Sequence, residues 1–357
     1  MEAIIFHERL YEFKKVESLL VDAKVLMNPY AIESEETYKL ENYLLNPGQR
    51  VSCLLDRNIV SYLIDLAKGI QLSDNFEQSR CHRLAAGLQA FFNAAKITSE
   101  PGLSYHEYIE RTSVKAADLD LSYFRSADNI DANYYLDICL NKISSIPKTI
   151  VPTFESGELI SFDESYRVKG FEFNIVVIKK ALCIRAQCKN DYEAVVMLLD
   201  WMFEEYVFCA PGFYFMAIYF SHKRIPKMLK SQSVLDVRNA AWDLALLQQW
   251  ISLANNDTGQ AWYLATMDKA IREVANLMLI KSTETEKDYF ERLQYEFSLM
   301  WGKKFGGGRK LFKRLTFWME NPEHPQRKAY RSKNNDNEYM LTLRTSVDEE
   351  YKRLATP

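Results

Sequence analysis

Four carboxylates occupy positions at which an acidic side chain could do chemistry: Asp56 in CLLDRNIV, Glu107 in SYHEYI, Asp243 in AAWDLAL and Asp268 in LATMDKAI. Asp56 and Asp268 each follow an apolar run and precede a helical pattern. In open α/β sheets, ligands bind at the carboxyl ends of strands, so both acids should lie at such an edge. Asp243 is surrounded by apolar residues, where a carboxylate is costly unless it is paired or binds a metal.

Carboxylates gathered at one edge of a sheet repel one another and hold raised pKa values. A divalent cation relieves that repulsion, and Mg²⁺ and Mn²⁺ prefer carboxylate and water oxygens as ligands. One or two such ions can activate water and stabilise the attacking and leaving oxygens of phosphodiester hydrolysis. The four acids, as catalytic residues and metal ligands together, therefore predict a hydrolytic nuclease.

Each acid also has a structural interpretation. Asp56 and Asp268 could be helix N-caps, a common position for Asp. Glu107 could complete a capping box with Ser104, because the two residues have the required spacing. Asp243 could be a first-turn acid that the helix dipole favours.

The elements that must position these acids alternate between strand and helix. Residues 51–55 and the AWYLAT segment read as buried strands, and a short extended piece lies at KITSEPG. Helical spacing of apolar residues predicts helices at 57–69 and 77–95, and a further helix follows Asp268. This alternation predicts an α/β layer with a central parallel sheet.

The same residues resemble the PIN-like nuclease family, named for the PilT N-terminus. The family's first strand ends in Asp-x-Asn-[Val/Ile], matched by Asp56-Arg57-Asn58-Ile59, and a later strand ends in Thr-x-Asp, matched by Thr266-Met267-Asp268. Glu107 and Asp243 match the two acids between those motifs. The resemblance covers roughly 51–112 and 238–281. It implies a three-layer α/β/α PIN-like fold and Mg²⁺- or Mn²⁺-dependent cleavage, usually of RNA, with Asn58 and Thr266 beside the substrate.

Glu107 and Asp243 lie further apart in this sequence than the corresponding acids of compact family members, so an insertion must separate them. Within it, the β-branched runs of FEFNIVVIKKALCIRAQC indicate strand. The expected organisation is an N-terminal helical extension at 1–50, a PIN-like nuclease domain at 51–281 with an inserted subdomain at 115–235, and a basic helical C-terminal region at 282–357.

A basic segment lies on an acidic chain. The net charge is −3, yet residues 303–333 hold ten Lys or Arg and two Glu. With a Gly306-Gly307-Gly308 hinge among them, the basic residues could form a flexible loop that holds phosphates, and nearby aromatic residues could stack on bases. The alternatives are a solvated helix end and an apolar helix face. The candidate substrate-binding residues are Lys303, Lys304, Arg309, Lys310, Lys313 and Arg314.

Composition favours a cytoplasmic protein with reduced thiols, since none of the six cysteines forms a CxxC pair. The most apolar stretch, 206–220, is short for a membrane span and contains Pro211 and Gly212, so no membrane partner is expected. The sequence therefore predicts a metal-dependent ribonuclease, and the resemblance makes a toxin or defence effector one role for it. RNA is the expected partner, while a homo-oligomer or a regulatory protein partner stays open. The alternative is a catalytically inactive PIN-like scaffold that binds RNA or protein.

Overall fold

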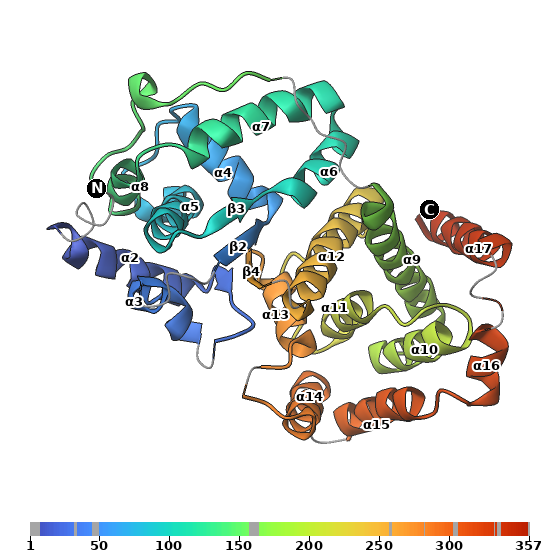
Figure 1. Cartoon of the computed structure of the whole chain (residues 1–357). Coiled ribbons are helices and arrows are strands. Elements are labelled where there is room, and N and C mark those ends of the chain that lie inside the picture. The colour runs from blue at the N-terminus through green and yellow to red at the C-terminus, as the bar shows by residue number, and fades with distance from the viewer. Residues whose placement is uncertain are drawn as a thin grey trace. The chain divides into compact units, whose positions relative to one another are not determined.

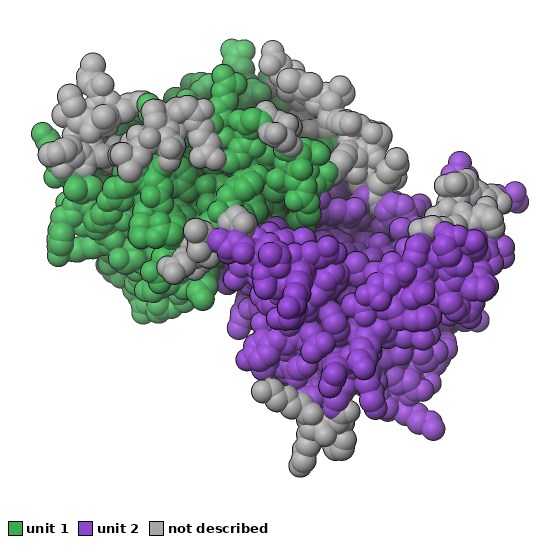
Figure 2. All heavy atoms as spheres, turned by 60° about the horizontal axis from the view of Figure 1, so that its bottom comes forward, with its two compact units in different colours: residues 1–164, 249–268 green, residues 165–248, 269–357 purple. Residues whose placement is uncertain are grey.

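The computed structural model describes residues 8–31, 34–44, 50–156, 164–256, 259–281, 283–302, 306–331, 333 and 337–355. The protein is mostly helical and has one small mixed sheet (Figure 1). It divides into two compact units, Met1–Glu164 with Gln249–Asp268, and Ser165–Gln248 with Lys269–Pro357 (Figure 2). One boundary between the units falls inside α12 (Val234–Asn255), after Gln248.

The sheet belongs to the first unit, and its described strands run in the order β1-β4-β2-β3. They are β1 (Leu26–Met27), β2 (Arg50–Leu55), β3 (Thr98–Glu100) and β4 (Gln260–Ala265). β2 pairs in parallel with both β3 and β4, as predicted. The expectation of a wholly parallel sheet is wrong at one edge, because β1 is antiparallel to β4. A strand of two residues is too short to produce a recognisable alternation of apolar and polar residues in the sequence.

β2 is central in this sheet and reads as a continuous apolar run because it is covered on both faces. Residues 51–55 are all buried, a pattern typical of parallel strands with layers on either side. Asp56 follows directly, and α4 (Arg57–Ala67) begins after it. The predicted strand-to-helix transition is therefore confirmed to within a residue.

Helices make up the rest of the first unit. The long helix α5 (Phe76–Ala95) packs against several of them (Figure 1). Gly87 allows one of these contacts, since a Cβ there would come within 2.7 Å of the Cys139 sulfur. The other helices of the unit are α2 (Leu10–Ala23), α3 (Leu40–Leu44), α6 (Gly102–Arg111), α7 (Val114–Asp128), α8 (Ala132–Cys139) and the 3₁₀ turns Ser34–Tyr38 and Lys148–Ile150.

The second unit contains helices and no strand among its described residues. The prediction of strand in FEFNIVVIKKALCIRAQC is wrong, because all of this segment except its last residue, Cys188, lies within α9 (Glu164–Gln187). Residues 175–178 are buried together, and an apolar run buried on all sides has the same sequence signature in a helix as in a core strand. The remaining helices are α10 (Asp191–Glu204), α11 (Ala210–Phe220), α13 (Lys269–Met278), α14 (Glu286–Trp301), α15 (Gly307–Glu320), α16 (Pro325–Arg331) and α17 (Asn337–Ala355).

The apolar stretch at 206–220 contains α11 (Ala210–Phe220), which is buried from Pro211 to its end. Across the described ranges, no helix combines the length and apolar character needed to cross a bilayer.

Candidate functional site

Two strand ends of the first unit bring Asp56 and Thr266 into contact. Leu55 at the end of β2 is in register with Ala265 at the end of β4, and the Asp56 amide donates to the Ala265 carbonyl at 3.0 Å. The Thr266 hydroxyl then donates to Asp56 Oδ2 at 2.8 Å, in a buried position. The expected meeting of the two motifs at one sheet edge is therefore observed.

Asp56 is also the N-cap of α4. Its Oδ1 accepts from the Asn58 amide at 3.3 Å, so the capping interpretation is confirmed for this residue. Only 3% of Asp56 is exposed, and burial raises its pKa, with the charge of Asp268 adding to the effect. The hydrogen bonds from Thr266 and Asn58 oppose the shift. A carboxylate held this way is costly to ionise unless a positive charge comes near it.

Asp268 lies half-buried at the same edge, immediately before α13. Its backbone amide donates to the Thr266 hydroxyl oxygen at 3.0 Å. One hydroxyl therefore accepts from the Asp268 backbone and donates to the Asp56 carboxylate. This arrangement fixes the two motifs to each other.

Glu107 is the third acid of the first unit and lies inside α6, where 8% of it is exposed. Burial raises the pKa of Glu107 to about 7, and the charge of Asp56 contributes to the increase. Arg111 opposes it, since its Nη2 lies 3.0 Å from Glu107 Oε1. An acid with a pKa near neutrality can hold or release a proton at physiological pH.

The predicted capping box of Ser104 and Glu107 is wrong. α6 begins at Gly102 with Pro101 as its N-cap, three residues before the expected N-cap Ser104. The Ser104 hydroxyl instead donates to the Pro101 carbonyl at 2.8 Å. Glu107 is therefore not used in capping the helix.

Arg57 is a residue near the site that the sequence did not single out. Its guanidinium Nη1 lies 2.8 Å from Asp120 Oδ2, and the group lies 4.0 Å from the centre of the Tyr108 ring. Its charge lowers the pKa of Glu107. Only its position directly after Asp56 could have indicated it from the sequence. Its partners Asp120 and Tyr108 come from other helices, so the sequence around Arg57 does not show them.

Asp243 belongs to the second unit, whereas the other three acids belong to the first. It lies in the interior of α12 and is half-buried. The interpretation of Asp243 as a first-turn acid, at the opening of a helix, is therefore wrong. Asp236 has that position, and it accepts from the Ser231 hydroxyl at 2.6 Å.

The three acids of the first unit offer the oxygen ligands that Mg²⁺ and Mn²⁺ prefer. Their mutual influence on pKa links Asp268 to Asp56 and Asp56 to Glu107. As arranged in the described residues, no group of three or more His, Cys, Asp or Glu side chains would hold a metal ion. The donor chemistry of these three acids thus fits a divalent cation.

The predicted glycine hinge is a packing contact. Gly306 is the N-cap of α15 with φ +63°, whereas Gly307 and Gly308 are buried in the first turn of the helix. A Cβ on Gly308 would lie 2.2 Å from the Phe297 carbonyl oxygen of α14. The glycines therefore let two helices approach closely, and they do not form a loop around phosphate.

The basic candidates differ in their surroundings. Lys303 and Lys304 lie outside the described residues. Three others on α15 are exposed: Arg309, Lys310 and Lys313. Arg314 is engaged within the second unit, where its Nε donates to Asp200 Oδ1 at 2.6 Å.

The aromatic residues near this segment pack inside the second unit. Trp318 is fully buried, stacks on Phe203 with 5.6 Å between ring centroids, and donates from Nε1 to Asp200 Oδ1 at 2.7 Å. Phe312 meets Phe290 edge to face. The apolar-face interpretation is confirmed for Trp318 and Phe312.

No protein-family model, no curated protein and no solved structure matches this chain.

Proposed function

We propose that the first unit is a PIN-like, Mg²⁺- or Mn²⁺-dependent nuclease acting on RNA. The single observation that carries the proposal is the contact between Asp56 and Thr266 at the adjacent ends of β2 and β4. It joins the Asp-x-Asn and Thr-x-Asp motifs in the way that a carboxylate site at a sheet edge requires. Glu107 is close enough to Asp56 for their charges to interact.

In this proposal Asp56, Glu107 and Asp268, the three acids of the first unit, hold the cation. The bound cation would polarise the scissile phosphate and stabilise developing negative charge. Thr266 orients Asp56, and Arg57 offsets the negative charge around Glu107. Asn58 is exposed directly after the site, where it would contact substrate.

Substrate RNA would also contact exposed cations of α15, chiefly Arg309, Lys310 and Lys313. Arg314 has a structural part in this scheme because of its bond to Asp200. A toxin or defence effector is the biological role that we propose for such an activity.

Cleavage of labelled RNA with Mn²⁺ or Mg²⁺ tests the proposal, together with Mn²⁺ titration by calorimetry. Asp56→Asn should abolish cleavage and weaken Mn²⁺ binding, since an amide lacks the negative charge of the ligand. Asp131→Asn is the matched control, because Asp131 is likewise an N-cap, accepting from the Asn133 amide at 2.8 Å on α8. Asn caps helices as well as Asp does, so both variants should fold. Equal activity in wild type and Asp56→Asn contradicts the proposal.

The second candidate is a catalytically inactive PIN-like scaffold that binds RNA or a protein. It is favoured by the bonding of Asp56, whose two carboxylate oxygens already accept from Thr266 and Asn58. RNA binding that persists without Mn²⁺ binding and without cleavage would identify the scaffold.

A further inference from the structure

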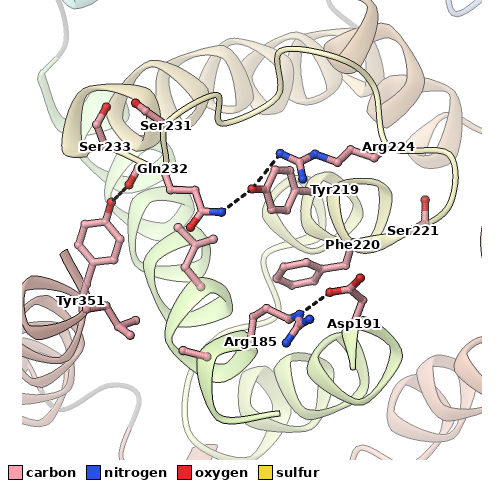
Figure 3. Close-up of a pocket in the computed structure, with 13 residues that line it drawn as sticks. Arg185, Asp191, Tyr219, Phe220, Ser221, Arg224, Ser231, Gln232, Ser233 and Tyr351 are labelled. Atoms are coloured by element: carbon pink, nitrogen blue, oxygen red, sulfur yellow. Dashed lines mark hydrogen bonds and ion pairs between the residues drawn. The ribbon is translucent and has the colours of Figure 1, made fainter. Parts of the chain in front are cut away.

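A cavity of about 840 Å³ lies within the second unit (Figure 3). Its walls come from α9, the first residue of α10, α11, α17 and the segment 221–233 that precedes α12. This volume is within the range of small-molecule sites in proteins, which is roughly 300–1,000 Å³. None of the acids assigned to the proposed nuclease lines it.

The hydroxyl group of Tyr219 is at the centre of a polar arrangement in this cavity. It accepts from Arg224 Nη2 at 3.1 Å and from Gln232 Nε2 at 2.9 Å, as Figure 3 shows. A hydroxyl has two acceptor positions and one donor, so both acceptor positions are filled and the proton is left to donate. Tyr219 is otherwise buried, and only 4% of it is exposed.

Two cations and one acid line the cavity. Its charged lining residues in the described chain are Arg185, Arg224 and Asp191. Arg185 is neutralised, because its Nε pairs with Asp191 and its Nη1 donates to the Cys188 carbonyl. Arg224 lies 4.1 Å from the centre of the Tyr219 ring and has no carboxylate partner within the described ranges. The cavity thus presents one uncompensated guanidinium beside a hydroxyl donor.

The segment that carries Arg224 is held in an uncommon backbone conformation. Lys227, Leu229 and Gln232 all have positive φ, at 76°, 42° and 52°. Such values are uncommon for residues other than glycine, and they cluster at ligand sites. Tyr351 of α17 donates its hydroxyl hydrogen bond to the Gln232 carbonyl, which fixes the Gln232 amide near Tyr219.

We propose that this cavity binds a phosphate-bearing small molecule of about mononucleotide size. A guanidinium fork and an adjacent hydroxyl donor suit the oxygens of a phosphate group. Phosphate alone would occupy a small part of 840 Å³, so an organic portion fills the remainder. That portion lies against Phe220 and Leu182, which supply apolar lining. The site is independent of the proposed nuclease.

Calorimetric titration of the full chain in chelator, with AMP, adenosine and inorganic phosphate as probes, tests this site. AMP should bind more tightly than either of the other probes. Arg224→Met should weaken AMP binding by at least about tenfold, because a charge-assisted bond to phosphate is lost. Tyr219→Phe should weaken it to a smaller extent, while adenosine affinity stays unchanged in both variants.

Lys230→Met is the matched control, since Lys230 is an exposed cation of the same segment that does not line the cavity. It should leave AMP binding unchanged. The proposal is overturned if neither AMP nor phosphate binds the wild type at millimolar concentration, or if adenosine binds as tightly as AMP. It is also overturned if Arg224→Met or Tyr219→Phe, folded by circular dichroism, bind AMP like the wild type.

Discussion

The Thr266 hydroxyl donates a 2.8 Å hydrogen bond to the buried Asp56 carboxylate, across the ends of two parallel strands. The two residues are far apart in the sequence, and the strand register alone brings them together. The same hydroxyl oxygen accepts from the Asp268 amide. The hydroxyl group of Thr266 thus connects the Asp56 side chain to the backbone of Asp268.

Replacing Thr266 by Val should destabilise the first unit by roughly 1.5–3 kcal/mol, because a hydrogen bond to a charged group is lost at unchanged volume. Thr266→Ser is the control, since it keeps the hydroxyl and removes one methyl group. Urea unfolding at pH 7 measures both variants. A Val variant as stable as the Ser variant would show that the bond contributes nothing measurable.

Glu107→Gln should stabilise the protein at neutral pH in chelator. The pKa of Glu107 is raised from 4.5 to about 7 in the fold, so folding favours the protonated acid. Below pH 4.5 the acid is protonated in both states and has no effect. As pH rises from 4.5 to 7, wild type loses about 3 kcal/mol that the variant keeps, at about 1.4 kcal/mol per pKa unit.

Thermal unfolding across that pH range checks the difference between the two proteins. Glu110→Gln is the matched control, because Glu110 is exposed on the same helix and its charge contributes less than burial does to the raised pKa of Glu107. It should follow the wild-type pH dependence. A constant offset between wild type and Glu107→Gln at all pH values would contradict the raised pKa.

Gly308→Ala should destabilise the second unit by about 3 kcal/mol or more, because the added Cβ would lie 2.2 Å from the Phe297 carbonyl oxygen. Gly170→Ala in α9 is the contrasting variant, since its Cβ would meet only ordinary contacts, the nearest being Gln248 Oε1 at 3.4 Å. It should stabilise by about 0.5–1 kcal/mol through helix propensity. Chemical denaturation compares them. A harmless Gly308→Ala would restore the flexible-hinge interpretation of the glycine run.

Neutralising Arg309, Lys310 and Lys313 together should weaken RNA binding and flatten its salt dependence. Each phosphate contact to single-stranded RNA contributes about 0.7 to the slope of log affinity against log salt, so three contacts contribute about 2. Arg314 is left intact because its loss would leave Asp200 without its ion pair. Titration of labelled RNA at several salt concentrations measures the slope.

The control for this experiment neutralises Lys15, Arg80 and Lys115, three exposed cations of the first unit. It changes the net charge by the same amount and should change the slope less. Equal slopes for the two triple variants would contradict RNA binding by α15 and would leave its cations as solvated surface residues.

Local patterns in the sequence predicted the elements around the acids. They predicted the buried strand β2, the helices α4 and α5, and the short strand β4. Each of these elements can be recognised from the spacing of apolar residues within it or from the residue at its boundary. The same local information gave a wrong prediction for α9, because the apolar residues of this segment do not show whether it follows the helical or the strand periodicity. It also failed at Ser104, where Pro101 begins the helix earlier.

What the sequence determined by itself was the type of the chemical groups and their places at the ends of elements: Asp56 after a strand, Thr266 and Asp268 after another. Tertiary structure decided which of them meet. Strand register set the contact of Asp56 with Thr266, helix packing brought Asp120 to Arg57, and close approach of α14 converted Gly308 from a hinge into a packing residue. Such contacts join chain segments that are far apart in the sequence. The local periodicity of apolar residues carries no information on which distant segments come together.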